Sequence, residues 1–166
     1  LSKVTQDMDE IYPDKTTQDF SEDETIRDFA QYVTDTSLNI LINQGHNTKN
    51  KSTCLTEMWC QEHYKFSHMS QHIHGNGTQI VGFYFLDVPT DSCLAVFHDP
   101  RPGKIQMGCE EHDETMITHA SSSFHIRPEP GVLVFTNSWL PHSFTKNKVN
   151  EPFRFIHFNI SFKENK

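Results

Sequence analysis

Residues 130–144 have the sequence PGVLVFTNSWLPHSF, and this stretch decides the fold. Pro130-Gly131 is typical of a turn, and the apolar run 132–135 has the length and composition of a buried strand. After a short polar connection the chain reaches His142 through Pro141. The stretch therefore predicts a strand, a connection and a position where a histidine is held by the sheet.

Similar short apolar runs lie before and after this stretch. From Met58 onward, short apolar or aromatic runs are separated by Gly, Pro, Asn and Asp, which is typical of an antiparallel sandwich or barrel. We expect strands at residues 56–64, 79–88, 93–98, 115–126, 132–136, 142–145 and 153–162. Residues 43–52 carry no apolar side chain and are expected to form a loop.

The N-terminal third of the chain has helical signals instead. After a polar arm of about 18 residues, Ser21 to Glu24 form a capping box that predicts the start of a helix. Apolar residues recur at helical spacing from Ile26 to Val33, and a second apolar group extends from Leu38 to Ile42. The polar residues 35–37 between the two groups predict two separate helices.

Length and composition bound the possible functions. A chain of 166 residues suits one domain, in which residues 1–56 form an arm with helices and residues 57–166 form the β core. The net charge of −8 argues against nucleic acid as a partner. There is no apolar run of roughly 18 residues and no basic-then-apolar leader, so we expect no membrane span and a cytoplasmic location, in the host if the protein is viral. The four cysteines match no zinc pattern and are expected to be reduced thiols.

A metal site is predicted from the histidines. His72 and His74 are two residues apart on an extended segment, so their side chains point to the same face. His142 on a facing strand would complete a set of three ligands, which leaves positions open on an ion for substrate or oxygen. The other histidines are expected to be ordinary surface, loop or half-buried residues, with His63 on a strand surface and His157 among the scattered ones.

The order of these motifs resembles the Fe(II)/2-oxoglutarate-dependent oxygenases. The resemblance rests on the HxH pair, GFYFL at 82–86, DPR at 99–101, GVLVF at 131–135, WLPH at 139–142, and then Arg154 and FN at 158–159. It is most similar to the small single-domain members found in bacteria and marine phages, and it covers roughly residues 57–162.

The resemblance implies a fold, a reaction and a set of roles. The fold would be α+β, with N-terminal helices packed on one face of a double-stranded β-helix, or jelly roll. The reaction would be oxidation of a small-molecule or peptidyl substrate, most plausibly hydroxylation, with Fe(II) held by His72, His74 and His142 and with 2-oxoglutarate as cosubstrate. Arg154 would pair with the far carboxylate of 2-oxoglutarate, because a guanidinium binds a carboxylate in a two-bond fork.

The chain departs from the family pattern at two positions. His74 stands where the family usually has Asp or Glu, so the site has either three histidine ligands, or a shifted set in which Asn76 takes the carboxylate position, or only two histidines and water. Ile156 stands two positions after the arginine, where the family often has Ser, and Asn159 or Tyr84 could supply that hydrogen bond.

Two other classes of function remain open at this point. One is a cupin-type enzyme that uses three histidines without 2-oxoglutarate. The other is a noncatalytic jelly-roll module for binding or structure, in which the histidines only satisfy the sheet. The substrate and the oligomeric state are not determined by the sequence. Arg101 is interpreted either as part of a turn or as a residue lining the substrate entrance.

Overall fold

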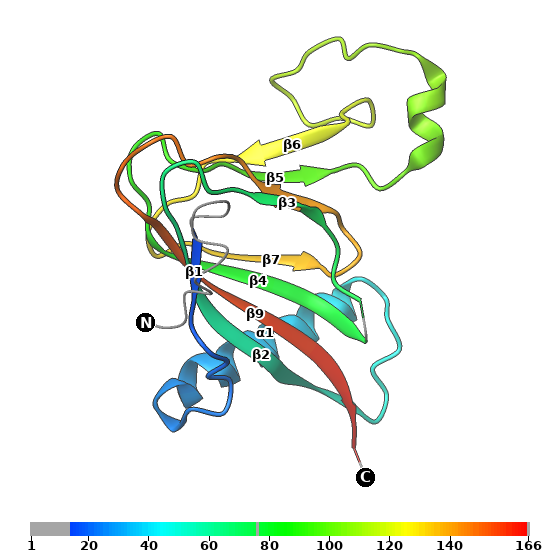
Figure 1. The fold of residues 1–166 in the computed structure, drawn as a ribbon. Helices are drawn as coiled ribbons and strands as arrows, with labels where there is room; N and C mark the ends of the chain where they lie inside the picture. The colour runs from blue at the N-terminus through cyan, green and yellow to red at the C-terminus, as the bar shows by residue number, and fades with distance from the viewer. Residues whose placement is uncertain (1–13, 76, 166) are drawn as a thin grey trace.

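A computed structural model describes residues 14–75 and 77–165, so most of the predicted N-terminal arm lies outside the described residues. The fold is a sandwich of two antiparallel sheets (Figure 1). The five-stranded sheet, called the major sheet below, has the order β1–β2–β9–β4–β7. Its strands are β1 (Asp14–Thr16), β2 (Lys51–His63), β9 (Phe153–Glu164), β4 (Thr78–Asp87) and β7 (Leu133–Asn137).

The four-stranded sheet, called the minor sheet, has the order β3–β8–β5–β6. Its strands are β3 (Met69–His72), β8 (His142–Phe144), β5 (Ala95–His98) and β6 (Ser123–Ile126). From β2 to β5 and again from β6 to β9, each strand lies in the opposite sheet from the one before it. This alternation is the topology of a double-stranded β-helix, and it confirms the predicted jelly roll.

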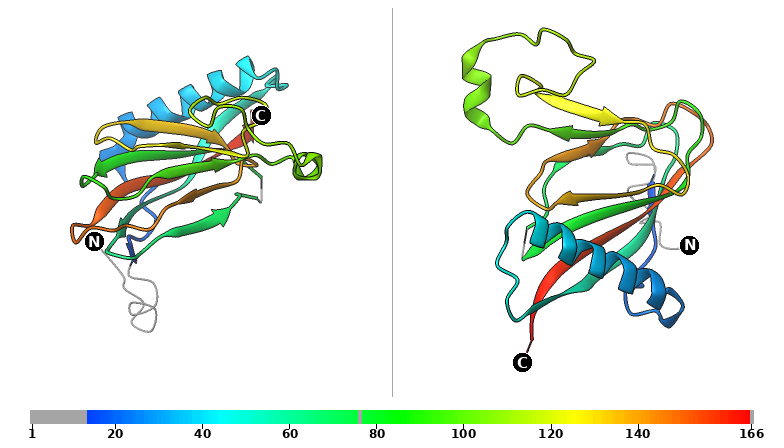
Figure 2. Two further views of the ribbon diagram at one scale, coloured as in Figure 1. Left: turned by 90° about the horizontal axis from the view of Figure 1, so that it is seen from above. Right: turned by 180° about the vertical axis from the view of Figure 1, so that it is seen from behind.

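One helix covers the outer face of the major sheet (Figure 2). A short 3-10 turn, η1 (Glu24–Ile26), leads into α1 (Arg27–Asn43). The prediction of two helices is therefore wrong, and the cap is Asp23, whose carboxylate accepts the Thr25 amide, rather than Ser21. The polar residues 35–37 do not break the helix, because only Ser37 among them is buried, on the same stripe as Val33 and Leu41.

The major sheet divides the core into two layers. The inner layer, between the sheets, contains Phe83, Phe85, Phe155 and their neighbours. The outer layer, between the major sheet and α1, contains Phe158 and Ile160 with residues of the helix. Because alternate residues of a strand face opposite sides, β9 sends Phe153, Phe155 and His157 inward and the residues between them outward.

Most predicted strands lie within a few residues of the observed ones, and two differences matter for the site. Only residues 123–126 of the predicted strand 115–126 are extended, and the preceding chain forms the 3-10 helix η2 (Pro102–Met107) and a long loop at one end of the minor sheet (Figure 1). β2 begins at Lys51, inside the predicted loop.

All four cysteines are free thiols. Neither α1 nor any other helix in the described residues has the length and apolar character needed to cross a bilayer.

Candidate metal centre

Three histidines from two neighbouring strands meet at the inner face of the minor sheet. His72 ends β3 and pairs in register with His142, the first residue of β8. His74 follows β3, and its backbone amide bonds the Ser138 carbonyl at 2.9 Å, which holds the segment beside the chain that leads to His142. One ring nitrogen of each histidine lies within 4.8 Å of the others. The structure thus brings together the three residues that the HxH and WLPH motifs predicted.

The backbone orients two of these rings in the same way. His72 Nδ1 lies 2.8 Å from the Ser70 carbonyl and His142 Nδ1 lies 2.9 Å from the Leu140 carbonyl, in each case two residues earlier in the chain. A carbonyl oxygen only accepts hydrogen bonds, so each Nδ1 carries the proton and each Nε2 keeps a free lone pair. In metal-binding histidines, a hydrogen bond of this kind from the nitrogen that does not bind the metal fixes the tautomer of the ring.

Burial keeps the rings of His74 and His142 neutral. Burial first, and then the neighbouring histidines, lower the pKa of His74 to about 4 and that of His142 to about 4. His74 Nε2 and His142 Nε2 are also buried without a hydrogen-bond partner in the described residues. A buried, neutral and unpartnered imidazole nitrogen is a strong candidate ligand for a metal ion.

A fourth histidine lies beside this cluster. His157 was expected to be one of the scattered surface or half-buried histidines, and that expectation is wrong: its exposed fraction is 1%. Its ring stacks on His74 with a centroid distance of 5.0 Å and lies 4.2 Å from the Trp59 ring. No sequence motif flagged it, because a single histidine within an apolar strand has no spacing partner that could reveal it.

Arg154 is placed away from the histidines. It precedes the inward-facing Phe155, so its side chain leaves the opposite face of the major sheet. There it lies between two carboxylates, with Nε donating to Glu62 at 2.5 Å and one terminal nitrogen donating to Asp87 at 2.8 Å. These hydrogen bonds raise the pKa of Arg154, and the structure does not bring its guanidinium to the cluster.

The other two residues expected at the cosubstrate are divided between the faces. The Tyr84 ring contacts Phe29 of α1 at 5.6 Å, so it belongs to the outer layer and not to the cluster. Asn159 faces inward, is 4% exposed, and donates from Nδ2 to the Glu57 carboxylate at 2.6 Å. Asn76, the alternative ligand, lies outside the described residues.

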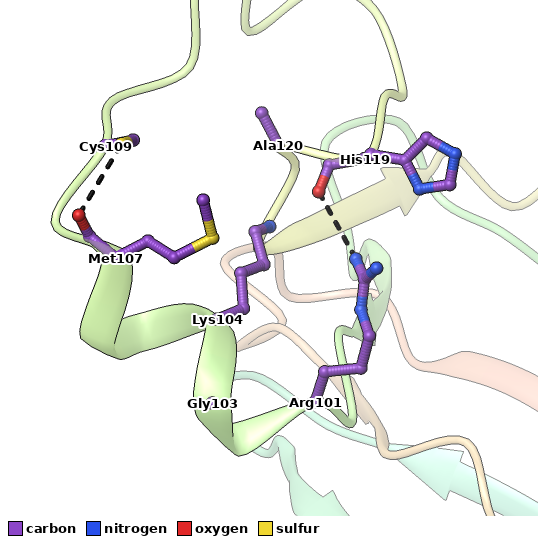
Figure 3. Close-up of a pocket in the computed structure, with 7 residues that line it drawn as sticks. All are labelled: Arg101, Gly103, Lys104, Met107, Cys109, His119 and Ala120. Atoms are coloured by element: carbon purple, nitrogen blue, oxygen red, sulfur yellow. Dashed lines mark hydrogen bonds between the residues drawn. The ribbon is translucent and has the colours of Figure 1, made fainter.

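The long loop before β6 forms a cavity of about 550 Å³ (Figure 3). Arg101 and Lys104 line it together with Met107, Cys109 and His119, and Arg101 donates to the His119 carbonyl at 3.3 Å. An adjoining cavity shares Arg101 and His119 and extends to Trp139, three residues before His142. Arg101 therefore lines both cavities, and its side chain is bound to Asp99 through both carboxylate oxygens.

The family model that matches the chain spans residues 57–159, which include His72, His74, His142 and His157 and all strands from β3 to β8. Its description is "Putative 2OG-Fe(II) oxygenase". The chain belongs to this family. No curated protein matches this chain.

Solved structures share the fold of this 2OG-Fe(II) oxygenase at low sequence identity. A prolyl-4-hydroxylase from Pseudomonas putida is 13% identical, with a TM-score of 0.58 over 89% of this chain and 70% of that one. A 2OG-Fe(II) oxygenase family oxidoreductase from Burkholderia pseudomallei is also 13% identical, with a TM-score of 0.52 over 76% of this chain and 57% of that one. HygX from Streptomyces hygroscopicus, solved with nickel and 2-oxoglutarate bound, is 12% identical, with a TM-score of 0.50 over 89% of this chain and 69% of that one. The chain thus spans just over half of the Burkholderia protein, and these likenesses show the fold alone.

The two groups that bind in this family fit the described residues unequally. A divalent metal fits, because three imidazole rings each place a nitrogen within 4.8 Å of the others, and burial keeps those of His74 and His142 neutral. The far carboxylate of 2-oxoglutarate has no matching cation on β9, where the inner face from Phe153 to Asn159 carries two phenylalanines, His157 and Asn159. The inner face of β9 therefore lacks the cationic side chain that was expected to bind this carboxylate.

Proposed function

We propose that this protein is an Fe(II)-dependent oxygenase that hydroxylates a small-molecule or peptidyl substrate, with 2-oxoglutarate as the cosubstrate that membership of the family predicts. The observation that carries the proposal is the meeting of His72, His74 and His142 within 4.8 Å, in a chain whose family binds iron. HygX, with metal and 2-oxoglutarate bound in the same fold, supports the cofactor assignment.

The chain's own residues would prepare the site in three ways. His72, His74 and His142 would hold the ion, and the nitrogen atoms of His74 and His142 need no deprotonation near neutral pH, since burial keeps these two rings neutral. The Ser70 and Leu140 carbonyls would keep the rings of His72 and His142 in the ligating tautomer. Phe83 and Phe97, which contact the His142 ring, would exclude water from the inner side. When bound, iron supplies the redox chemistry that activates oxygen.

Three neutral ligands also change the charge of the site. A divalent ion on three imidazoles keeps its full charge of +2, whereas one carboxylate ligand would reduce it to +1. A dianionic chelator such as 2-oxoglutarate is therefore attracted more strongly by the ion itself, which offsets part of what a missing cationic clamp would contribute.

The position of Arg154 favours a second candidate function. Because Arg154 pairs with Glu62 and Asp87 on the outer face, a three-histidine oxygenase that does not use 2-oxoglutarate is also supported. In that case the substrate itself would chelate the metal. The acidic net charge argues against nucleic acid as the substrate of either enzyme.

One experiment separates these functions. The purified protein is loaded with Fe(II) without oxygen and then mixed with oxygenated buffer, with and without 2-oxoglutarate, while oxygen use and succinate are measured. Succinate release that needs both Fe(II) and 2-oxoglutarate supports the first candidate. Oxygen use that is independent of 2-oxoglutarate, in the presence of candidate substrates, supports the second.

Two variants identify the site in this assay. His142→Ala should abolish metal binding and succinate release, because it removes a buried ligand. His46→Ala, which changes an exposed histidine in the loop after α1, should alter neither. If wild-type protein binds no divalent metal, both candidate functions are excluded and the noncatalytic module becomes the remaining explanation.

A further inference from the structure

The inner face of the major sheet, opposite the three histidines, carries polar atoms that no described residue satisfies. We propose that His157, Asn159 and Thr136 form a neutral floor that contacts the molecule bound to the metal, and that this floor takes an uncharged group that donates hydrogen bonds, such as an amide or a hydroxyl. The proposal rests on the proposed function, because it requires a metal ion at the histidine cluster.

His157 is held at this floor by aromatic contacts on two sides. Its ring lies 4.2 Å from Trp59 on β2 and 5.0 Å from Phe83 on β4, measured between centroids. Its third neighbour is His74, so the ring lies directly beside the metal cluster. Within the described residues its Nδ1 atom is buried without a hydrogen-bond partner. An apolar residue would fill the same space without that cost, and because the ring also lies against His74, a molecule bound at the cluster is placed to supply the partner.

Two further unpartnered atoms lie in the neighbouring row of the sheet. Val81 pairs in register with Asn159 on one side and with Thr136 on the other, so all three face the inner layer to which Val81 belongs. Within the described residues, Asn159 Oδ1 and Thr136 Oγ1 are both buried without a partner. This row therefore offers a hydroxyl and an amide oxygen, and the adjacent inward-facing row holds Phe83 and His157.

The chemistry of these atoms selects against a carboxylate. One N–H of Asn159 Nδ2 donates to Glu57 at 2.6 Å, and the atom of this side chain that is buried without a partner in the described residues is its oxygen, an acceptor. A carboxylate has no hydrogen to give to that oxygen, and Glu57 behind it adds a further negative charge. An amide or a hydroxyl can donate to the Asn159 oxygen, and either can accept from the Thr136 hydroxyl. The floor is thus complementary to a neutral group and not to the far end of 2-oxoglutarate.

The test compares three probes that bind metal through the same oxalyl head. Oxalate is the head alone, N-oxalylglycine adds a carboxylate end, and N-oxalylglycinamide replaces that carboxylate with a neutral amide of equal size. Each probe is titrated by calorimetry into protein loaded with Ni(II), which binds without turnover. We expect the amide probe to bind at least as tightly as N-oxalylglycine.

Variants then locate the contact. His157→Phe keeps the aromatic packing and removes the polar nitrogen, and it should weaken the amide probe about threefold to tenfold while leaving oxalate unchanged. Thr136→Val removes only the hydroxyl and should weaken the amide probe by a similar factor. His63→Phe is the matched control, because His63 is equally buried and unpartnered but contacts Phe144, Phe153 and Phe155 instead of the cluster.

The outcomes separate this inference from the proposed function. If N-oxalylglycine binds tenfold or more tightly than its amide while oxalate binds normally, the neutral floor is overturned and the metal centre stands. If His157→Phe and His63→Phe have equal effects on the amide probe, the contact with His157 is overturned. If oxalate itself does not bind to the nickel-loaded protein, the metal centre falls and the inference falls with it.

Discussion

At the scale of single residues, His74 has the most consequential position in the molecule. On one side, a nitrogen of its ring lies within 4.8 Å of nitrogens of His72 and His142, close enough for all three to bind one ion. On the other side, its ring stacks on His157. His74→Ala should lower the affinity for Ni(II) or Fe(II) at least tenfold, because only two ligands remain. His74→Asp should retain the metal, since a carboxylate also ligates Fe(II), but it should weaken oxalate about tenfold because the charge of the centre falls by one. Calorimetric titrations measure both, and unchanged metal affinity in His74→Ala would show that His74 is not a ligand.

Replacing Arg154 is expected to change the stability of the protein and not its metal site. Arg154→Gln leaves the Glu62 carboxylate, whose side chain is only 5% exposed, without its cation. We expect the free energy of unfolding to fall by about 1–3 kcal/mol, a range reduced for the partial exposure of the guanidinium. Oxalate affinity should stay unchanged, because the side chain is on the outer face. Urea denaturation of the single variant and of the double variant with Glu62→Gln measures the effect, and the double variant should recover part of the loss.

Residue spacing was sufficient to predict the histidine cluster and insufficient to predict its surroundings. His72 and His74 share a face whatever the exact register, so the pattern was sufficient for them. Arg154 is three residues from His157 and therefore on the other face of the same strand, which the order of motifs does not encode. A shift of one residue in a strand reverses its facing, so a role carried over by position along the chain is insecure there.

At the scale of elements, the contact between β4 and β9 depends on the absence of a side chain at Gly82. A Cβ at this position would lie 1.9 Å from the Phe158 ring, which packs against Phe29 of α1 and Phe135 of β7. Gly82→Ala should therefore lower the free energy of unfolding by about 1–3 kcal/mol through overpacking. Gly103→Ala, in η2, has open space around the new methyl group and is the control. Equal urea midpoints for the two variants would contradict this explanation.

The elements were predictable where the hydrophobic pattern alone decides them. Short apolar or aromatic runs bounded by turn residues placed β4, β7 and β9 within a few residues, because each is buried on at least one sheet face. The helix was predicted as two pieces, since a polar triplet looks like a break when the packing of Ser37 against the sheet is unknown. The prediction of one long strand at residues 115–126 was wrong for a related reason. The threonines of this segment suit a strand, but the chain has no neighbouring strand to pair with before residue 123.

At the scale of the whole molecule, buried histidines make stability depend on pH. Burial lowers the pKa of His63 to about 4, whereas an unfolded chain restores about 6.5. Between these values the unfolded state binds more protons, so the free energy of unfolding is constant above about pH 6.5 and falls as the pH drops toward 4. His63 alone contributes about 3 kcal/mol to this loss. Urea titrations from pH 7 to 4 should show the decline, and His63→Phe should make it shallower.

The carbonyl contacts of His72 and His142 have a consequence for how the enzyme acquires its ion. Each ring is set by a carbonyl two residues earlier, within its own segment of backbone, and not by the ion. The site is thus assembled as the sheets form, and loading becomes a separate and reversible event after folding. A chelator should therefore remove the ion, and added metal should restore it, while the sandwich stays intact.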